Sequence, residues 1–310
     1  MRAFILFLAC IIQLAVLAQD SLTIISYNVE NLFDYKHDTI RNDYSFLPEG
    51  DRHWNYHRYQ TKLDRIAQVL ANISGWESAA LVGLCEVENA HCLQDLCYRL
   101  KRFHYHYIHY ESADERGIDV ALLYDTTKVK ILNSTPLQVP LKDDATRDIL
   151  YVKALLNSND TLHTMVCHLP SMLNGGATTD WKRQTAKQVI QQQIDSILQH
   201  NPDANILVMG DMNSEPMDDL QGMNNTMLTI AKANQGTHKY QGLWSCLDQF
   251  YISDALSKHT KATIFAPDWL LEKDAKYLDY QPKRTYMGYR YHDGYSDHLP
   301  IVLRIANDWL

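Results

Sequence analysis

The segment that decides the fold is residues 205–216, NILVMGDMNSEP. Its opening run, residues 205–209, is almost wholly apolar, which is typical of a short strand covered on both faces. Asp211 and Asn213 follow two positions apart, so they share a face if the strand continues. A carboxylate and an amide placed there can accept a proton from water and orient it. Taken alone, Gly-Asp-Met-Asn fits a turn equally well.

The same arrangement recurs at four other apolar runs. Their ends carry Asn28 and Glu30, Glu86 and Glu88, His168 and Ser171, and Asp297 and His298. Carboxylates are costly to bury unless they are paired or bind a cation. Because Mg²⁺ takes oxygen ligands, the residues alone make Glu86 and Asp297 its expected ligands, and they do not separate Mg²⁺ from Mn²⁺ or Ca²⁺. Five such pieces in order predict phosphate chemistry at one edge of a sheet.

A second group of residues indicates how charge on phosphorus would be stabilised. A cationic imidazole at His298 can do this, provided that a carboxylate holds its tautomer and raises its basicity. Asp248 begins the apolar run 247–252 and is the expected partner. Taken alone, His168 in its apolar run would be read as a core histidine.

These motifs together resemble the endonuclease/exonuclease/phosphatase superfamily, in its deoxyribonuclease I-like form, from about Leu22 to about Ile305. The resemblance implies a four-layered α/β sandwich of two packed mixed β-sheets flanked by helices. It also implies in-line attack of water on phosphorus. Its residue roles come from the matching motifs: Asp211 and Asn213 handle the water, His168 and His298 (paired with Asp248) stabilise the phosphorane, and Glu86 holds the metal with Asn28, Glu30 and Asp297 nearby.

Other residues refine the resemblance without settling the substrate. His168 is similar to the deoxyribonuclease and sphingomyelinase branches, since abasic-site endonucleases usually carry Tyr there. Arg116, before the run 118–124, is a candidate phosphate contact, although a surface arginine fits equally well, and Ser171 is a candidate substrate contact. Lys182 and Arg183 either rim the cleft or face solvent.

The predicted elements fit sheets that face each other and carry helices outside. Helices are expected over 56–73 and 180–200, with Thr179 or Asp180 as the cap of the second, and more weakly over 217–232. Residues 276–295 are expected to form a long surface loop. Strands are expected over 22–27, 80–85, 118–124, 150–156, 162–167, 205–209, 247–252 and 300–305.

Composition bears on the compartment and the partners. Residues 1–18 (Met1, Arg2, then an apolar run to Ala18) predict a signal peptide and hence a secreted or periplasmic protein, with residues 19–310 as one catalytic domain. No other segment is apolar enough to span a membrane. Removing residues 1–18 leaves a net charge of −9, which argues against a sequence-independent DNA coater but allows a hydrolase that meets phosphate beside a cation. Five cysteines remain, an odd number that leaves at least one free thiol. Cys85 and Cys167 are expected to be buried thiols.

The expected function is that of a secreted, metal-dependent nuclease, an endonuclease that hydrolyses phosphodiester bonds as a monomer, so the expected partner is a phosphodiester substrate such as nucleic acid. The alternatives are a lipid or polyol-phosphate hydrolase of the same fold and, behind these, a binding protein without catalysis. A lipid enzyme should expose an apolar hairpin for membrane contact, for which 267–271 and 276–295 are the candidates.

Overall fold

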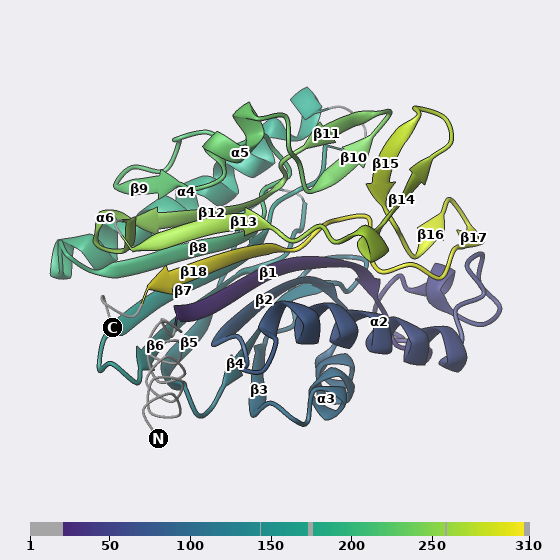
Figure 1. Ribbon diagram of the computed structural model, residues 1–310, viewed down its shortest axis with the longest axis horizontal. Helices are drawn as coiled ribbons and strands as arrows, with labels where there is room; N and C mark the ends of the chain where they lie inside the picture. Colours follow the sequence, from purple (N-terminus) through teal and green to yellow (C-terminus); the bar gives the residue numbers. More distant parts are fainter. Residues whose placement is uncertain (1–20, 143, 173–175, 258, 307–310) are drawn as a thin grey trace, which may run out of the picture.

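The chain folds as two facing six-stranded sheets with helices on their outer sides (Figure 1). The computed structural model describes residues 21–142, 144–172, 176–257 and 259–306, so the predicted signal peptide lies outside the described residues. This arrangement is the four-layered α/β sandwich implied by the motifs, which confirms the fold prediction.

The first sheet places its two central strands in parallel. Strand β1 runs beside β2 with Asn28 opposite Cys85, so both strands end at the same edge. The order of the sheet is β13 (Thr260–Ile264), β18 (Ile301–Ala306), β1 (Ser21–Leu32), β2 (Leu81–Val87), β4 (Asp119–Asp125) and β3 (Tyr105–His109).

The second sheet repeats this design. Strands β7 and β8 are parallel, with His168 opposite Asp211, and the antiparallel β12 brings Asp248 opposite Asp211 as well. The order is β5 (Val129–Leu137), β6 (Ile149–Leu156), β7 (Thr161–His168), β8 (Asn205–Asp211), β12 (Asp248–Ser253) and β9 (Met223–Asn225).

Three apolar clusters hold the layers together. The middle cluster lies between the sheets and includes Leu122 of the first sheet and Leu207 of the second, both fully buried. The outer clusters pack α2 (Tyr56–Ser74) and α3 (Ala90–Arg99) on the first sheet, and α4 (Gly176–His200) on the second. Because each sheet is covered on both faces, its central strands are continuous apolar runs.

Short elements complete the chain around the edges of the sheets. The helical turns are η1 (Tyr44–Phe46), α5 (Leu228–Lys232), α6 (Asp254–Ser257) and η2 (Asp268–Leu270). Three hairpins lie together at one end of the sandwich (Figure 1): β10 (His238–Tyr240) with β11 (Leu243–Ser245), β14 (Leu271–Asp274) with β15 (Asp279–Pro282), and β16 (Tyr286–Met287) with β17 (Arg290–Tyr291).

All eight predicted strands and the helix over 56–73 are present, with three corrections elsewhere. Helix α4 begins at Gly176, so Thr179 and Asp180 lie inside it and neither caps it. Residues 217–232 form β9 and the short α5 instead of one helix. Residues 276–295 include the hairpin strands β15, β16 and β17, and Thr285 and Tyr295 between and after these strands are buried, so this segment is only partly a surface loop.

The cysteines behave as small apolar residues. Cys85, Cys92, Cys97, Cys167 and Cys246 are all free thiols, and only Cys97 is partly exposed. Cys85 and Cys167 are fully buried at the ends of β2 and β7, as expected. Among the described helices, none has the length and apolar character needed to cross a membrane.

Candidate active site

One carboxylate oxygen lies at the centre of the predicted site. Asp211 Oδ2 accepts a hydrogen bond from Asn28 Nδ2 at 3.0 Å. It also lies 3.6 Å from His168 Nε2 and 3.8 Å from His298 Nε2. These residues come from β1, β7, β8 and the segment before β18, so the shared edge of both sheets brings them together. Burial raises the pKa of Asp211 to about 7, and this carboxyl is therefore poised to exchange a proton near neutrality.

The two histidines of the site have opposite charge preferences. His298 Nδ1 lies 2.7 Å from Asp248 Oδ2, which fixes the ring and leaves Nε2 facing Asp211. Burial acts to lower the pKa of His298, but the carboxylates of Asp248 and Asp211 outweigh it and raise the pKa well above its ordinary value. For His168, burial lowers the pKa to about 3, with Arg116 and His298 acting in the same direction. The site therefore holds a cationic His298 beside a neutral His168.

Glu86 reaches this edge through a distortion of its strand. The pairing of β2 with β4 shifts between Cys85 and Val87, and Glu86 has a φ of 68°. A bulge of this kind re-aims a side chain, and positive φ in a residue other than glycine costs free energy that often marks a functional position. The Glu86 carboxylate accepts bonds from Asn28 Nδ2 at 3.2 Å and from the Asn31 N–H at 2.8 Å. It also lies 3.9 Å from His168 Nε2.

These carboxylates suit a hard divalent cation. Glu86 and Asp211 both converge on the single amide of Asn28, and together they supply only oxygen donors. A cation between them would also offset the free-energy cost of burying the Asp211 carboxylate, which is 2% exposed. The donor set therefore fits Mg²⁺, Mn²⁺ or Ca²⁺ and does not choose among them.

Two predicted metal neighbours, Asp297 and Glu30, also have protein partners. Asp297 Oδ2 binds the Arg284 guanidinium at 2.6 Å. The Glu30 carboxylate accepts the backbone N–H of Thr285 at 2.6 Å and of Tyr286 at 3.3 Å. Although burial raises the pKa of Asp297, His298 and Arg284 outweigh it, so the net direction is downward. Glu30 therefore holds the 284–286 segment in place, and the charge of Asp297 is balanced by Arg284.

Sequence reasoning missed two residues at this edge. Arg284 lies in a stretch rich in Lys, Arg and Tyr that showed no strand or helix pattern. The His238 ring lies 4.8 Å from the His298 ring, and the ligand atoms of His238, Asp297 and His298 fall within 4.8 Å of one another. Nothing in the sequence near His238 indicated this contact, because sixty residues separate it from His298.

The remaining candidates lie around the site. The Asn213 amide donates to the Leu169 carbonyl at 2.9 Å, while its backbone N–H binds Asp211 Oδ1 at 2.9 Å, so Asn213 orients Asp211 and the 168–171 turn. The half-exposed side chain of Arg116 lies close enough for its charge to affect His168. Ser171 is partly exposed, three residues after His168.

The two basic residues expected near the cleft differ. Arg183 is 4% exposed and donates to the Pro170 carbonyl at 3.2 Å, so it supports the turn after His168 and does not face solvent. Lys182 is more exposed and pairs with Asp144. This pair leaves Lys182 as the one of the two that faces solvent.

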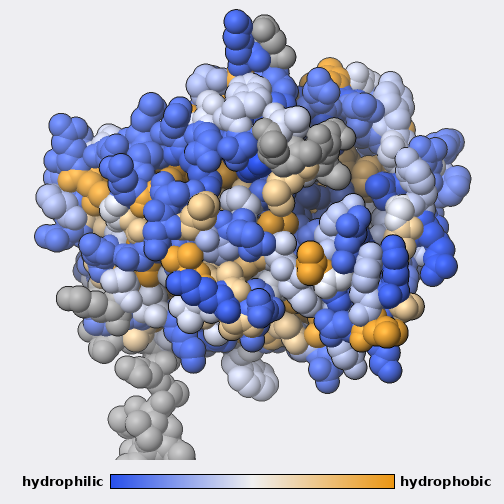
Figure 2. All heavy atoms as spheres, turned by 90° about the horizontal axis from the view of Figure 1, so that it is seen from above, coloured by the Kyte–Doolittle hydropathy of each residue, from blue (hydrophilic) through white to orange (hydrophobic). Residues whose placement is uncertain are grey.

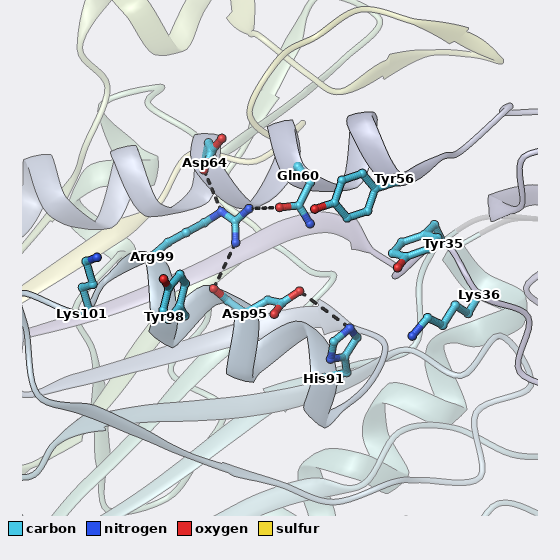
Figure 3. Close-up of a pocket in the computed structure, with 10 residues that line it drawn as sticks. All are labelled: Tyr35, Lys36, Tyr56, Gln60, Asp64, His91, Asp95, Tyr98, Arg99 and Lys101. Carbon is cyan, nitrogen blue, oxygen red and sulfur yellow. Dashed lines mark hydrogen bonds and ion pairs between the residues drawn. The ribbon is translucent and has the colours of Figure 1, made fainter.

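A groove of about 560 Å³ lies elsewhere, between α2 and α3 (Figure 3). Arg99 crosses it and binds Asp64 Oδ1 at 2.7 Å, the Gln60 side chain and the Asp95 carbonyl. Its charged groups are therefore largely paired with one another. This groove contains none of the predicted catalytic residues.

Comparisons with known proteins bear on the family and the fold. The model of the Endonuclease/Exonuclease/phosphatase family matches residues 23–307. No curated protein matches the chain. Among solved structures, a truncated TDP2 from Caenorhabditis elegans has a TM-score of 0.61 at 15% identity, with 92% of this chain and 98% of that chain covered.

Two further structures share the fold. The human Nocturnin catalytic domain with bound sulfate has a TM-score of 0.57 at 16% identity, covering 92% of this chain and 94% of its own. TDP2 from D. rerio, complexed with a single-strand DNA product, has a TM-score of 0.53 at 19% identity, covering 92% and 98%. At these identities the likeness establishes the fold alone.

Proposed function

The chain belongs to the Endonuclease/Exonuclease/phosphatase family, and from this we propose that it is a divalent-metal-dependent phosphodiesterase that cleaves nucleic acid. The observation that carries the proposal is the convergence of Asn28, His168 and His298 on Asp211 Oδ2. The DNA product bound to the D. rerio structure of the same fold supports the choice of nucleic acid.

The proposed reaction is attack of water on phosphorus, in which a new P–O bond forms, the ester P–O bond opposite to it breaks, and the leaving alkoxide takes a proton from solvent. Asp211 takes the proton from the water, and Asn213 holds Asp211 through its backbone N–H. Cationic His298, oriented by Asp248, and His168 donate to the phosphate oxygens as charge builds on them. Arg116, whose half-exposed side chain lies near His168, contacts a neighbouring phosphate of the substrate.

A divalent cation is part of this proposal. Glu86 would hold it, with Asn28 and Asp211 adjacent. Bound there, such a cation neutralises phosphate oxygens and the leaving group. Arg284 already balances the charge of Asp297, so we assign Asp297 to positioning Arg284 and not to direct ligation.

The decisive test is hydrolysis by the purified chain of residues 19–310. Single-stranded DNA, plasmid DNA, RNA and bis-p-nitrophenyl phosphate are offered with Mg²⁺ and then with excess chelator. We expect nucleic acid cleavage that the chelator abolishes and Mg²⁺ restores. Asp211→Asn should lower kcat by several orders of magnitude, whereas the matched change Asp203→Asn on an exposed turn should not. Cleavage that persists in chelator, or full activity of Asp211→Asn, would contradict the mechanism.

A second candidate function has one observation in its favour. The tips of two neighbouring hairpins expose apolar side chains: Tyr240 and Leu243 are 67% and 74% exposed on β10–β11, and Leu278 is 92% exposed on β14–β15. Such tips suit contact with a lipid surface, as a lipid phosphodiesterase requires. The other candidate segment, 267–271, buries Leu270 and does not supply such a tip. Hydrolysis of sphingomyelin vesicles with intact nucleic acid would favour this second function.

We also propose export and a monomeric state. Export is supported by the composition of residues 1–18, and N-terminal sequencing of the secreted chain should begin near Gln19. The monomer is supported by the face in Figure 2, which is mainly hydrophilic with small, separate apolar groups. Light scattering that gives twice the chain mass would reject it.

A further inference from the structure

A second polar cluster lies where β3 and β4 meet, outside the proposed catalytic group. His109 ends β3 and pairs with Ala121 of β4, so both side chains point to the same face of the sheet. Asp119, two residues before Ala121, shares that face, and so does Glu111 if the strand continues two residues beyond His109. Ala121 belongs to the apolar cluster beneath α2 and α3, so this face is the helix-covered one.

The side chains of the cluster approach one another closely. His109 Nε2 lies 3.8 Å from Asp119 Oδ2, and His109 Nδ1 lies 3.9 Å from Glu111 Oε1. One ligand atom from each of the three residues falls within 4.8 Å of the others. The His109 and Asp119 side chains are 3% and 2% exposed, while that of Glu111 is 53% exposed and can move toward them.

A polar atom in this cluster lacks a partner. His109 Nε2 is fully buried, and no group in the described part of the chain forms a hydrogen bond with it. A buried nitrogen without a hydrogen-bond partner is unfavourable, so its position calls for a ligand.

We propose that His109, Glu111 and Asp119 form a structural site for a divalent cation of the Zn²⁺ class. One imidazole nitrogen and two carboxylates suit Zn²⁺, whereas Mg²⁺ and Ca²⁺ prefer oxygen ligands alone. Ser112 donates its hydroxyl and, at 3.3 Å, its backbone N–H to Asp119, which orients that carboxylate from behind. The site requires no part of the proposed catalytic mechanism.

The position of this site suggests what the cation does. The residues between Glu111 and Asp119 form the segment that presents Arg116 near His168. Arg41 binds the carbonyls of Ser112 and Asp114 at 2.6 and 3.0 Å, and Arg147 lies 3.4 Å from Asp114. A cation bound by Glu111 and Asp119 would join the two ends of this segment, make it a rigid loop and fix Arg116 near His168.

The test measures Zn²⁺ binding in a Glu86→Gln background, which weakens the proposed catalytic cation site. Titration calorimetry with ZnCl₂ and thermal unfolding are applied to this chain and to versions that also carry Glu111→Gln, His109→Gln or Glu115→Gln. Glu115 is an exposed acid of the same segment and serves as the matched control. The exposed Glu111 can be changed without disturbing the core, so its variant keeps the test valid if His109→Gln fails to fold.

We expect Glu86→Gln to bind one Zn²⁺ and to unfold at a higher temperature with it. Glu111→Gln should weaken this binding at least tenfold and His109→Gln should remove it, while Glu115→Gln leaves it unchanged. If the Glu111 and His109 variants bind Zn²⁺ as tightly as Glu86→Gln alone, the ion lies elsewhere, for example at His238, and the proposal is overturned. Absence of Zn²⁺ binding in Glu86→Gln would overturn it as well. Neither result depends on catalytic activity.

Discussion

At the scale of single residues, the two imidazoles of the proposed site differ in pKa because their surroundings differ. His298 is bordered by the carboxylates of Asp248 and Asp211, and its pKa lies well above the ordinary value. Burial, together with the positive charges of Arg116 and His298, holds the pKa of His168 well below the ordinary value. One ring therefore carries charge at neutral pH and the other does not, so in the proposed reaction His298 donates to the phosphate as a cation and His168 as a neutral imidazole.

Replacing Asp248 tests whether catalysis needs the positive charge of His298. Asp248→Asn removes the charge that raises the pKa of His298, so the imidazolium loses its proton at a lower pH than in the parent chain. If catalysis needs cationic His298, activity falls as pH rises through that pKa, and this fall should move to lower pH in the variant. We expect kcat to drop about 10²–10⁴-fold at neutral pH. The measurement is kcat/KM against pH on bis-p-nitrophenyl phosphate, and an unmoved alkaline limb would contradict the role of Asp248.

A histidine far from the site predicts how stability depends on pH. Burial lowers the pKa of His163 to about 4, and Tyr151 Oη lies 2.7 Å from His163 Nδ1. Since the unfolded chain binds a proton near pH 6.5, the stabilising effect of neutral His163 is present above that pH and is lost as pH falls toward 4. The free energy of unfolding should therefore fall less over this range in His163→Gln. Urea unfolding at pH 7 and at pH 4.5 measures the free energy of unfolding of both chains. An equal fall between the two pH values in the parent chain and in His163→Gln would contradict this role of His163.

At the scale of elements, the parallel pair β7–β8 depends on Gly210. Gly210 has a φ of 139°, and a Cβ there would come within 1.8 Å of the Cys167 carbonyl oxygen. Asp211 directly follows it, so the close approach of these two strands sets where the central carboxylate lies.

Gly210→Ala should therefore destabilise the chain by several kcal/mol, the range seen when strain and a backbone clash combine. Gly288→Ala is the control, because its φ of 64° carries strain but nothing lies within 4 Å of the added atom. It should cost only about 1 kcal/mol. Denaturant unfolding compares the two, and equal losses would show that the clash is relieved by movement of β7.

The elements also show what a sequence can predict. Strands such as β8 are continuous apolar runs because they are covered on both faces, and their positions were predicted within two residues. Strand β5 was missed because it lies at a sheet edge with Lys130 and Asn133 exposed, so no apolar run marks it. Strand β1 continues to Leu32, five residues past its predicted end, through a register shift that periodicity cannot reveal.

The same distinction applies to the site. Asp211 and Asn213 were predictable because their chemistry is encoded within one short motif at a strand end. The pairing of Arg284 with Asp297, the contact between the His238 and His298 rings and the partners of Glu30 depend on how the hairpins fold over the sheet edge. No local pattern records such contacts, because they are set by the tertiary path of residues 236–296.

At the scale of the whole molecule, the two sheets share one apolar core. Residues such as Val120 and Leu122 of the first sheet pack in the same cluster as Val166 and Leu207 of the second. The edge that carries the proposed site draws on both sheets, so neither sheet holds the complete set of these residues. We therefore expect the described chain to unfold as one cooperative unit, as the single-domain prediction requires.

A core substitution in α4 tests this expectation. Ile190 is fully buried between α4 and the second sheet, and Ile190→Ala should cost about 2–5 kcal/mol through lost burial and a cavity. If the sheets unfold together, the slowest-exchanging amides of β2 should lose as much protection as those of β8, although β2 lies in the other sheet and does not border the cavity. Native-state hydrogen exchange of both chains gives the two losses. If only β8 and its neighbours lose protection, the sheets open independently. The edge that carries the proposed site would then lie between two units that can separate without complete unfolding.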